Sequence, residues 1–164
     1  PQASVDGQGR QDAGGTGQGR QDAGGTEDEL TVIRDTLFSA LDERDEDLAG
    51  TALLGLHRLA REHDDFDSEE VTAEAVEIAQ DPLASDRCRL TALRVAAAAK
   101  SPEILPTARD LAQNAKTDLL KAAAITTLGD FADPQDKELL TKLSTAPRRQ
   151  ISSAAKAALV QYSE

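Results

Sequence analysis

Apolar residues recur at intervals of three or four through most of this chain, and short polar segments separate the runs. This period is typical of amphipathic α-helices. An excess of Ala, together with few β-branched runs, also favours helix. The pattern predicts eight helices, over residues 28–43, 46–62, 69–80, 86–99, 101–115, 118–131, 134–143 and 149–162.

The stretch 118–131 carries the clearest pattern. Its apolar stripe consists of Leu120, Ala124, Leu128 and Phe131. Small residues that would let a neighbouring helix approach closely lie beside the stripe, at Ala123, Ala124 and Thr127. Thr117 is suited to cap this helix, and Asp133-Pro134 is suited to open the next one. By the same reasoning Thr26 and Ser85 are predicted to cap the first and fourth helices.

The period also predicts which side chains form the core. In the first two helices these are Leu30, Ile33, Leu37, Phe38, Leu41, Leu48, Ala52, Leu56 and Leu59. In the later helices they include Val71, Ala75, Ile78, Ala79, Ile104, Ala108, Leu111, Ala115, Leu139, Leu140 and Leu143. The single cysteine, Cys88, is also expected in the core, because unpaired cysteine is among the most buried residue types.

The arrangement of the 118–131 stretch recurs along the chain. Its motif positions are Leu120, Lys121, Ala124, Thr127, Leu128, Gly129 and Phe131. The same positions are occupied upstream by Cys88, Arg89, Ala92, Val95, Ala96, Ala97 and Ala99, and downstream by Ile151, Ser152, Ala155, Ala158, Leu159, Val160 and Tyr162. A more distant copy consists of Leu48, Ala49, Ala52, Gly55, Leu56, His57 and Leu59. The first positions are 40, 32 and 31 residues apart, close to the length of a two-helix repeat.

This motif resembles the second helix of a HEAT repeat, including the repeats of lyases that attach bilin pigments. Thr127 is the clear departure from the family pattern, which has Ala there. The resemblance covers residues 27–164 and implies an all-α fold, a right-handed α-solenoid of about four antiparallel helix pairs. A single pair would expose an apolar face, so stacking of neighbouring pairs should supply the stability.

Residues 1–26 form a separate segment, in which the decapeptide of residues 7–16 is repeated without change as residues 17–26. The segment is rich in Gly, Gln and Asp and has almost no apolar content. It is therefore predicted to be a flexible, disordered tail. A Gly-rich phosphate loop is excluded by its context, because no strand precedes the glycines and no Gly-Lys-Ser/Thr follows them.

The net charge of −12 is unevenly distributed. Residues 27–80 carry −13, whereas residues 81–164 carry +2. This balance disfavours nucleic acid and anionic membranes as partners. It is compatible with a basic protein partner or with a role in solubility alone, and of the two the role in solubility is favoured. No apolar run approaches the roughly 20 residues that a membrane span requires.

Candidate chemistry is sparse. The acidic segment 63–70 does not follow the EF-hand pattern, and the two histidines are not placed to share a zinc ion. No nucleophile and base stand together in a catalytic motif. Aromatic residues make up 2% of the chain, too few for the stacking platforms that single-stranded nucleic acid requires. We therefore expect no catalytic residues, no metal site and no cofactor.

The resemblance implies instead a non-catalytic protein-interaction or scaffold module. Its candidate partner-binding residues are Arg89 and Lys121, at the second motif position, and Asp86 and Asp118, two residues before the first. In related repeats an acid and a base at these positions join adjacent pairs, so a purely structural role is the competing interpretation. Two alternatives stay open for the protein as a whole: a HEAT-like enzyme of the bilin-lyase or glycosylase type, and a spacer between domains.

The chain contains no Met, so Pro1 is expected to follow a cleavage or to lie within a longer chain. A cytoplasmic location is favoured, and export after removal of a signal peptide stays open. We expect a monomer or one part of a longer protein.

Overall fold

The structure is a computed structural model that describes residues 23–43, 47–63 and 66–163. These residues are all-helical, without a β-strand, as predicted. Eight α-helices are present in the described part: α1 (Ala23–Ser39), α2 (Asp47–Glu62), α3 (Ser68–Gln80), α4 (Asp86–Ala98), α5 (Leu105–Asn114), α6 (Asp118–Phe131), α7 (Lys137–Leu143) and α8 (Arg149–Val160). Four short 3₁₀ segments accompany them: η1 (Ala40–Asp42), η2 (Pro102–Ile104), η3 (Pro134–Asp136) and η4 (Gln161–Ser163).

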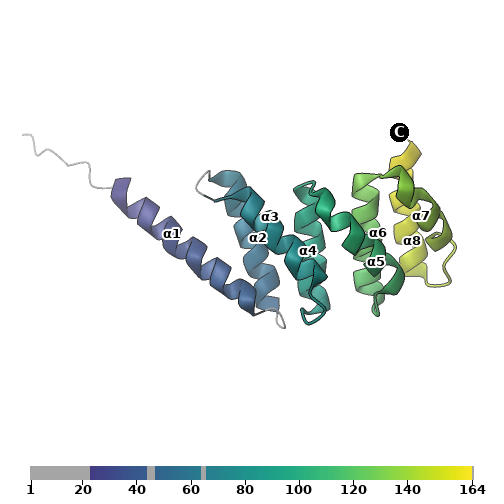
Figure 1. The fold of residues 1–164 in the computed structure, drawn as a ribbon, viewed down its shortest axis with the longest axis horizontal. Helices are drawn as coiled ribbons and strands as arrows, with labels where there is room; N and C mark the ends of the chain where they lie inside the picture. The colour runs from purple at the N-terminus through teal and green to yellow at the C-terminus, as the bar shows by residue number, and fades with distance from the viewer. Residues whose placement is uncertain (1–22, 44–46, 64–65, 164) are drawn as a thin grey trace, which may run out of the picture.

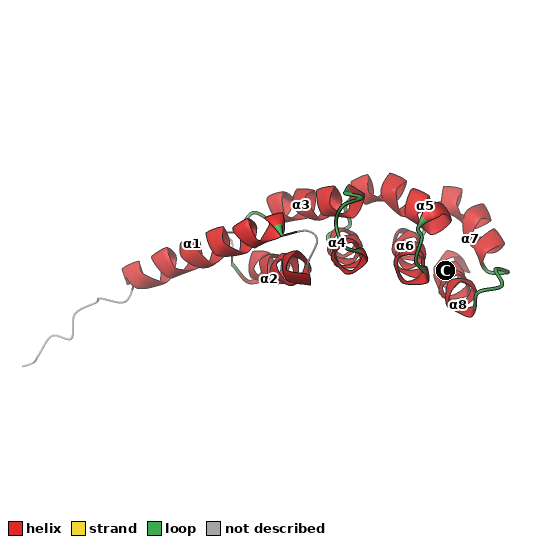
Figure 2. Cartoon of the chain, turned by 90° about the horizontal axis from the view of Figure 1, so that it is seen from below, coloured by secondary structure: helices red, strands yellow, loops and turns green. Residues whose placement is uncertain are grey.

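The helices form a row of pairs (Figure 1). Within each pair, α1 contacts α2, α3 contacts α4, α5 contacts α6, and α7 contacts α8. Along the row, α2, α4, α6 and α8 each contact the next in turn. Seen from below, the row bends, with these four helices on the inside of the bend (Figure 2). We call α2, α4, α6 and α8 the inner layer, and α1, α3, α5 and α7 the outer layer.

The predicted local signals largely agree with the structure from α3 onward. Ser85 Oγ accepts a hydrogen bond from the Cys88 amide at 3.1 Å, and Thr117 Oγ1 accepts one from the Leu120 amide at 3.4 Å. Asp133 accepts one from the Gln135 amide at 3.0 Å. These caps satisfy amides that lack partners within the helix, so they fix where each helix begins.

The core is built from aliphatic side chains and Ala, as the scarcity of aromatic residues requires. The predicted core is buried from Val71 onward, apart from positions that are half-buried: Ala115, Phe131, Leu139 and Leu143. Cys88 is fully buried, which confirms its assignment to the core. Within the described residues, no buried side-chain nitrogen or oxygen lacks a hydrogen-bond partner.

The first helix differs from its prediction. α1 begins at Ala23, so Thr26 lies inside the helix instead of capping it, and η1 takes over from Ala40. Ile33, predicted to be buried, is 44% exposed. The reason is tertiary, because α1 packs chiefly against α2 and η1 and its opposite side is left open. The rest of the predicted tail, residues 1–22, lies outside the described residues, as does the predicted turn at residues 44–46.

The first motif copy is also out of register by one residue. Leu48, assigned to the first motif position, is 50% exposed, whereas Ala49 is completely buried. With Ala49 in that position, Asp47 precedes it by two residues, as Asp86 and Asp118 precede Cys88 and Leu120. Beside it, a Cβ on Gly50 would lie 3.4 Å from Thr91 Oγ1 of α4, an ordinary contact distance.

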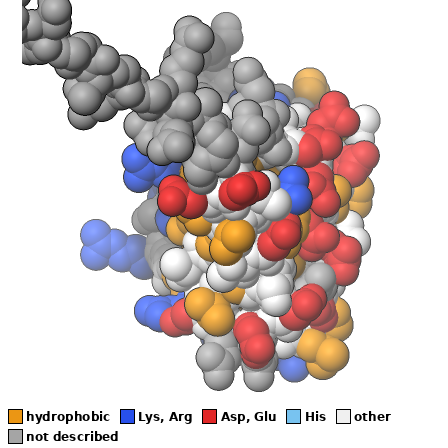
Figure 3. All heavy atoms as spheres, turned by 90° about the vertical axis from the view of Figure 1, so that its left-hand side faces the viewer, with side chains coloured by type: hydrophobic (Ala, Val, Ile, Leu, Met, Phe, Trp, Pro, Cys, Tyr) orange, Lys and Arg blue, Asp and Glu red, His pale blue; other side chains and the backbone are white. Residues whose placement is uncertain are grey.

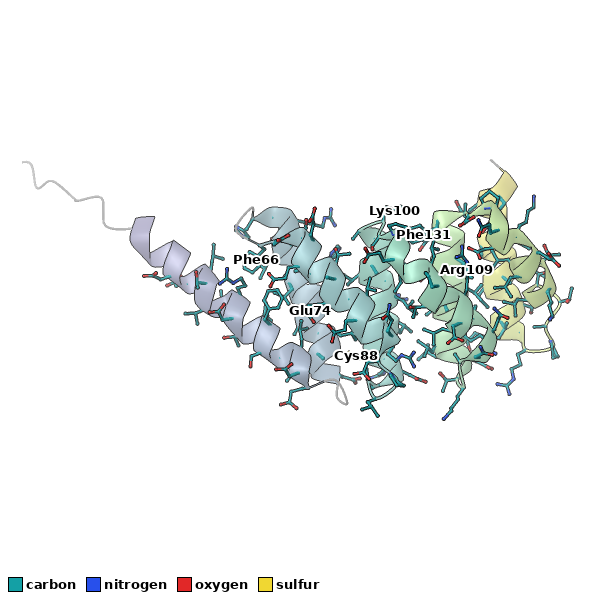
Figure 4. All side chains as sticks on the ribbon, in the orientation of Figure 1. Phe66, Glu74, Cys88, Lys100, Arg109 and Phe131 are labelled. Carbon is teal, nitrogen blue, oxygen red and sulfur yellow. The ribbon has the colours of Figure 1, made fainter. Side chains whose placement is uncertain are left out.

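The inner helices α4 and α6 end in the same way. Lys100 and Ala132 both adopt positive φ angles, 56° and 50°, in the left-handed region where helices commonly terminate. Each is followed two residues later by a proline that opens a 3₁₀ segment. Lys100 also joins the two ends, since its Nζ donates to the Asp130 carbonyl at 2.8 Å and lies 5.7 Å from the centre of the Phe131 ring (Figure 4).

The close packing of α6 against α8 predicts that Gly129 cannot be replaced without loss of stability. Gly129→Ala should destabilise the fold by about 1–3 kcal/mol, because the new Cβ would lie 2.7 Å from Ala158 Cβ and 2.8 Å from Ala158 Cα. The matched control is Gly55→Ala, whose Cβ would meet Leu37 methyl carbons at 3.5 and 3.6 Å, ordinary contact distances. In that variant the higher helix propensity of Ala over Gly should stabilise the fold by up to about 1 kcal/mol. Urea unfolding of both variants measures the difference, and equal effects would contradict the close approach of α6 and α8.

Candidate functional site

The two predicted acidic site residues link neighbouring inner helices. Asp86, at the start of α4, accepts a hydrogen bond from Thr117 Oγ1 at the start of α6. Asp118, at the start of α6, accepts one from Arg148 Nη1 at 2.5 Å, just before α8. The equivalent residue of α2, Asp47, pairs with Arg87 of α4 at 2.6 Å. The three acids therefore form a ladder along one end of the inner layer.

The two predicted basic residues serve a different purpose. Arg89 Nε donates to the carbonyl oxygen of Ala79 at 3.0 Å, and Lys121 Nζ donates to that of Gln113 at 2.8 Å. Both carbonyls belong to the last turn of the outer helix in the same pair, where a cation is favourable. The structure thus does not bring these bases together with Asp86 and Asp118. Asp86 and Asp118 join one helix pair to the next, whereas Arg89 and Lys121 join the two helices of a single pair.

A third polar cluster lies at the C-terminal end of the row. Asp136 is 2% exposed, and its two carboxylate oxygens accept hydrogen bonds from Arg109 at 2.6 and 3.1 Å. Arg109 also reaches Asp133 at 2.8 Å. The Asp136 hydrogen bond is the main cause that raises the pKa of Arg109. Tyr162 donates to the Asp133 carbonyl at 3.0 Å, and burial, with smaller effects of both carboxylates, raises its pKa. This cluster holds α5, η3 and η4 together.

The described surface also has open grooves. One, of about 590 Å³, lies where the C-terminal ends of α2 and α4 meet the start of α3. His57 and Arg61 contribute to its wall, together with Ser68, Glu69 and Glu103. Burial, and to a smaller extent the charge of Arg61, lowers the pKa of His57. The imidazole is therefore kept neutral at physiological pH.

The second groove, about 460 Å³, runs between α2 and α4 on the inner layer. We call it the inner groove. It is lined by Asp47, Gly50, Thr51, Leu54, Arg87, Cys88, Leu90, Thr91, Arg94 and Leu119. Leu54 and Leu119 are 51% and 45% exposed, although leucine is an apolar residue. The groove thus combines accessible apolar surface with two arginines and the carboxylate of Asp47.

Charge is divided between the two layers. In the inner layer α2 is neutral, α4 carries +2, α6 carries −1 and α8 carries +2. In the outer layer residues 28–39 of α1 carry −2, α3 carries −4, α5 is neutral and α7 carries +1. Viewed from the α1 end, acidic side chains gather on one side of the molecule and Lys and Arg project from the other (Figure 3). The sequence-level division into an acidic first half and a neutral second half had hidden this arrangement.

Neither a metal-binding cluster nor a membrane-spanning helix is found among the residues that the structure describes. No group of three His, Cys, Asp or Glu side chains there is arranged to hold a metal ion. None of the helices that the structure describes is long and apolar enough to cross a bilayer.

Comparisons with known proteins add no family to this description. Neither protein-family models, nor curated proteins, nor solved structures gave a significant match to the chain. The function must therefore be inferred from the geometry.

Sequence reasoning missed the inner groove. Arg87 and Arg94 are seven residues apart, which places both on one face of α4, and this signal was present in the sequence. Leu54 and Leu119 carried no such signal, because an apolar residue on a helix is normally read as core. Their juxtaposition depends on the packing of three different helices.

The Arg109 cluster predicts a stability effect. Asp136→Ala should cost about 2 kcal/mol, less than a fully buried pair would, because Arg109 retains 30% of its side-chain exposure. Asp136 occupies the position that buried Ile104 holds one helix pair earlier, two residues after the proline. The double variant Arg109→Met/Asp136→Ile should therefore be more stable than Asp136→Ala. A double variant less stable than the single one, in urea unfolding, would contradict this assignment.

The lowered pKa of His57 predicts that the stability of the fold depends on pH. Because folding lowers the pKa of His57 from its ordinary 6.5, the unfolded chain takes up a proton at higher pH than the folded chain. Stability should fall as the pH drops below about 6.5. His57→Gln should reduce that fall, and Arg61→Gln should reduce it less, since Arg61 is the smaller cause. Unfolding midpoints measured across this range, with an identical fall in wild type and His57→Gln, would exclude a lowered pKa.

Proposed function

We propose that this chain is a HEAT-like, right-handed α-solenoid of about four helix pairs that acts as a non-catalytic protein-interaction or scaffold module. Three observations support the repeat interpretation. The first motif positions, corrected to Ala49, recur at similar spacing; α4 and α6 end with the same backbone conformation; and Asp47, Asp86 and Asp118 each link their helix to the start of the next inner helix. Repetition of one packing unit is what distinguishes a solenoid from an irregular helical bundle.

The observation that carries the binding function is the inner groove. Leu54 and Leu119 keep about half of their surface in water, in a hollow of about 460 Å³ on the inside of the bend. Burying the rest of each side chain would contribute about 1 kcal/mol, half of the usual value for a complete leucine. An accessible apolar hollow with a polar rim is typical of a surface that binds another molecule.

The residues predicted from the sequence are better explained by structural roles. The side chains of Arg89, Lys121, Asp86 and Asp118 all make hydrogen bonds within the chain. These bonds support the competing interpretation, in which the charges join helices to one another. A contribution of these four residues to partner binding stays a prediction, and we place the principal binding surface in the inner groove.

The proposed surface can be tested with leucine variants. Replacing Leu54 and Leu119 by Ser should abolish retention of a partner in pull-downs analysed by quantitative mass spectrometry, since it removes the apolar contacts of the groove. Leu83→Ser is the matched control, because Leu83 is 84% exposed and does not line the inner groove. Circular dichroism checks that all variants stay helical. A partner held equally by the double variant and the control would move the binding surface elsewhere.

A further inference from the structure

Apolar side chains form part of the lining of the inner groove. Leu54 comes from α2, Leu90 from α4 and Leu119 from α6, so three consecutive inner helices contribute one leucine each. Leu54 and Leu119 are about half exposed, and Leu90 is half-buried. A partner that covers these leucines must therefore present apolar side chains of its own.

The rim is basic. Arg87 and Arg94 lie on the same face of α4, seven residues apart, which separates their backbone positions by about 10.5 Å along the helix. Arg94 has neither a hydrogen bond nor an ion pair to the residues that the structure describes. Arg87 pairs with Asp47, but both side chains are largely exposed, at 74% and 58%. Such an exposed pair is weak and can exchange Asp47 for another carboxylate.

The inner layer around the two arginines is also positively charged. The inner layer carries +3 and the outer layer, counted from residue 28, carries −5. Approach of an anionic ligand is therefore favoured from the inside of the bend and disfavoured from the outside.

We propose that the inner groove binds an acidic segment of a partner protein, in which carboxylates flank leucine-like side chains. This inference rests on the proposed function and names the chemistry of its partner. The apolar side chains contact Leu54 and Leu119, and two carboxylates pair with Arg87 and Arg94. Carboxylates on one face and about 10 Å apart are three residues apart in a polyproline II segment, or two turns apart in a helix.

A protein segment fits the groove better than a nucleic acid does. Phosphate backbones are bound by many cations with bases stacked on aromatic rings, whereas the lining has two arginines and three leucines and contains no aromatic residue. The net charge of −12 would also repel a polyanion at long range. A short acidic segment carries fewer negative charges than a nucleic acid, and its apolar side chains also contact the leucines of the groove.

The test is a selection of peptides from a random phage library on the intact chain. Peptides that still bind the Leu54→Ser/Leu119→Ser variant are removed. Peptides dependent on the groove should be enriched in Asp and Glu next to Leu, Ile or Phe. Their affinity, measured by fluorescence anisotropy, should fall about tenfold in Arg94→Glu and should weaken as salt is raised.

Lys137→Glu is the charge-matched control. It changes the net charge by the same amount as Arg94→Glu, but on exposed Lys137 at the start of α7 in the outer layer. Its affinity for the selected peptides should stay within about twofold of wild type. An equal loss in both variants would show that only net charge matters, and would overturn the assignment to the rim.

The remaining outcomes separate the two proposals. Groove-dependent peptides that are neutral or basic would overturn the acidic partner and leave the protein-binding function intact. Enrichment of no groove-dependent peptide would count against both. A short DNA duplex that displaces the peptides, with the same dependence on Arg94, would show that the rim recognises phosphate and would overturn the choice of a protein segment.

Discussion

The close approach of the inner helices is the constraint on which the rest of this structure depends. At its tightest point the Gly129 backbone lies so near Ala158 that a methyl group would not fit. Between α2 and α4 the helices are also in contact, since a Cβ on Gly50 would meet Thr91 at an ordinary contact distance. In a chain with 2% aromatic residues, such contacts between small side chains supply the packing density that larger rings provide elsewhere.

Close packing determines where the polar groups can act. Charged side chains find partners at the ends of the inner helices, where amides and carbonyls are unsatisfied and the backbones diverge. The acids at the starts of α2, α4 and α6 link neighbouring helices, while Arg89 and Lys121 reach the carbonyls of the outer layer. The inner groove adjoins the first of these links, because Asp47 and Arg87 belong to its lining, whereas its leucines take no part in the links.

The two layers differ in charge as well as in curvature. A basic inner layer and an acidic outer layer give the molecule two chemically different sides, although its net charge is strongly negative. The acidic outer layer is compatible with the basic partner that the sequence left open, and the inner groove with an acidic one. The two surfaces lie on opposite layers and do not compete for the same residues.

The sequence by itself determined the helices, their caps and the buried stripes from α3 onward. Those features depend on backbone hydrogen bonds and on a period of three to four residues, both of which are local. The tertiary structure alone decided the exposure of Ile33 and Leu48 and the register of Ala49, because burial depends on which helix lies opposite. It also decided the burial of Asp136, whose charge requires Arg109 from 27 residues earlier in the chain. The inner groove also depends on tertiary packing. Leu54, Arg94 and Leu119 form one surface only because three helices, far apart in sequence, pack side by side.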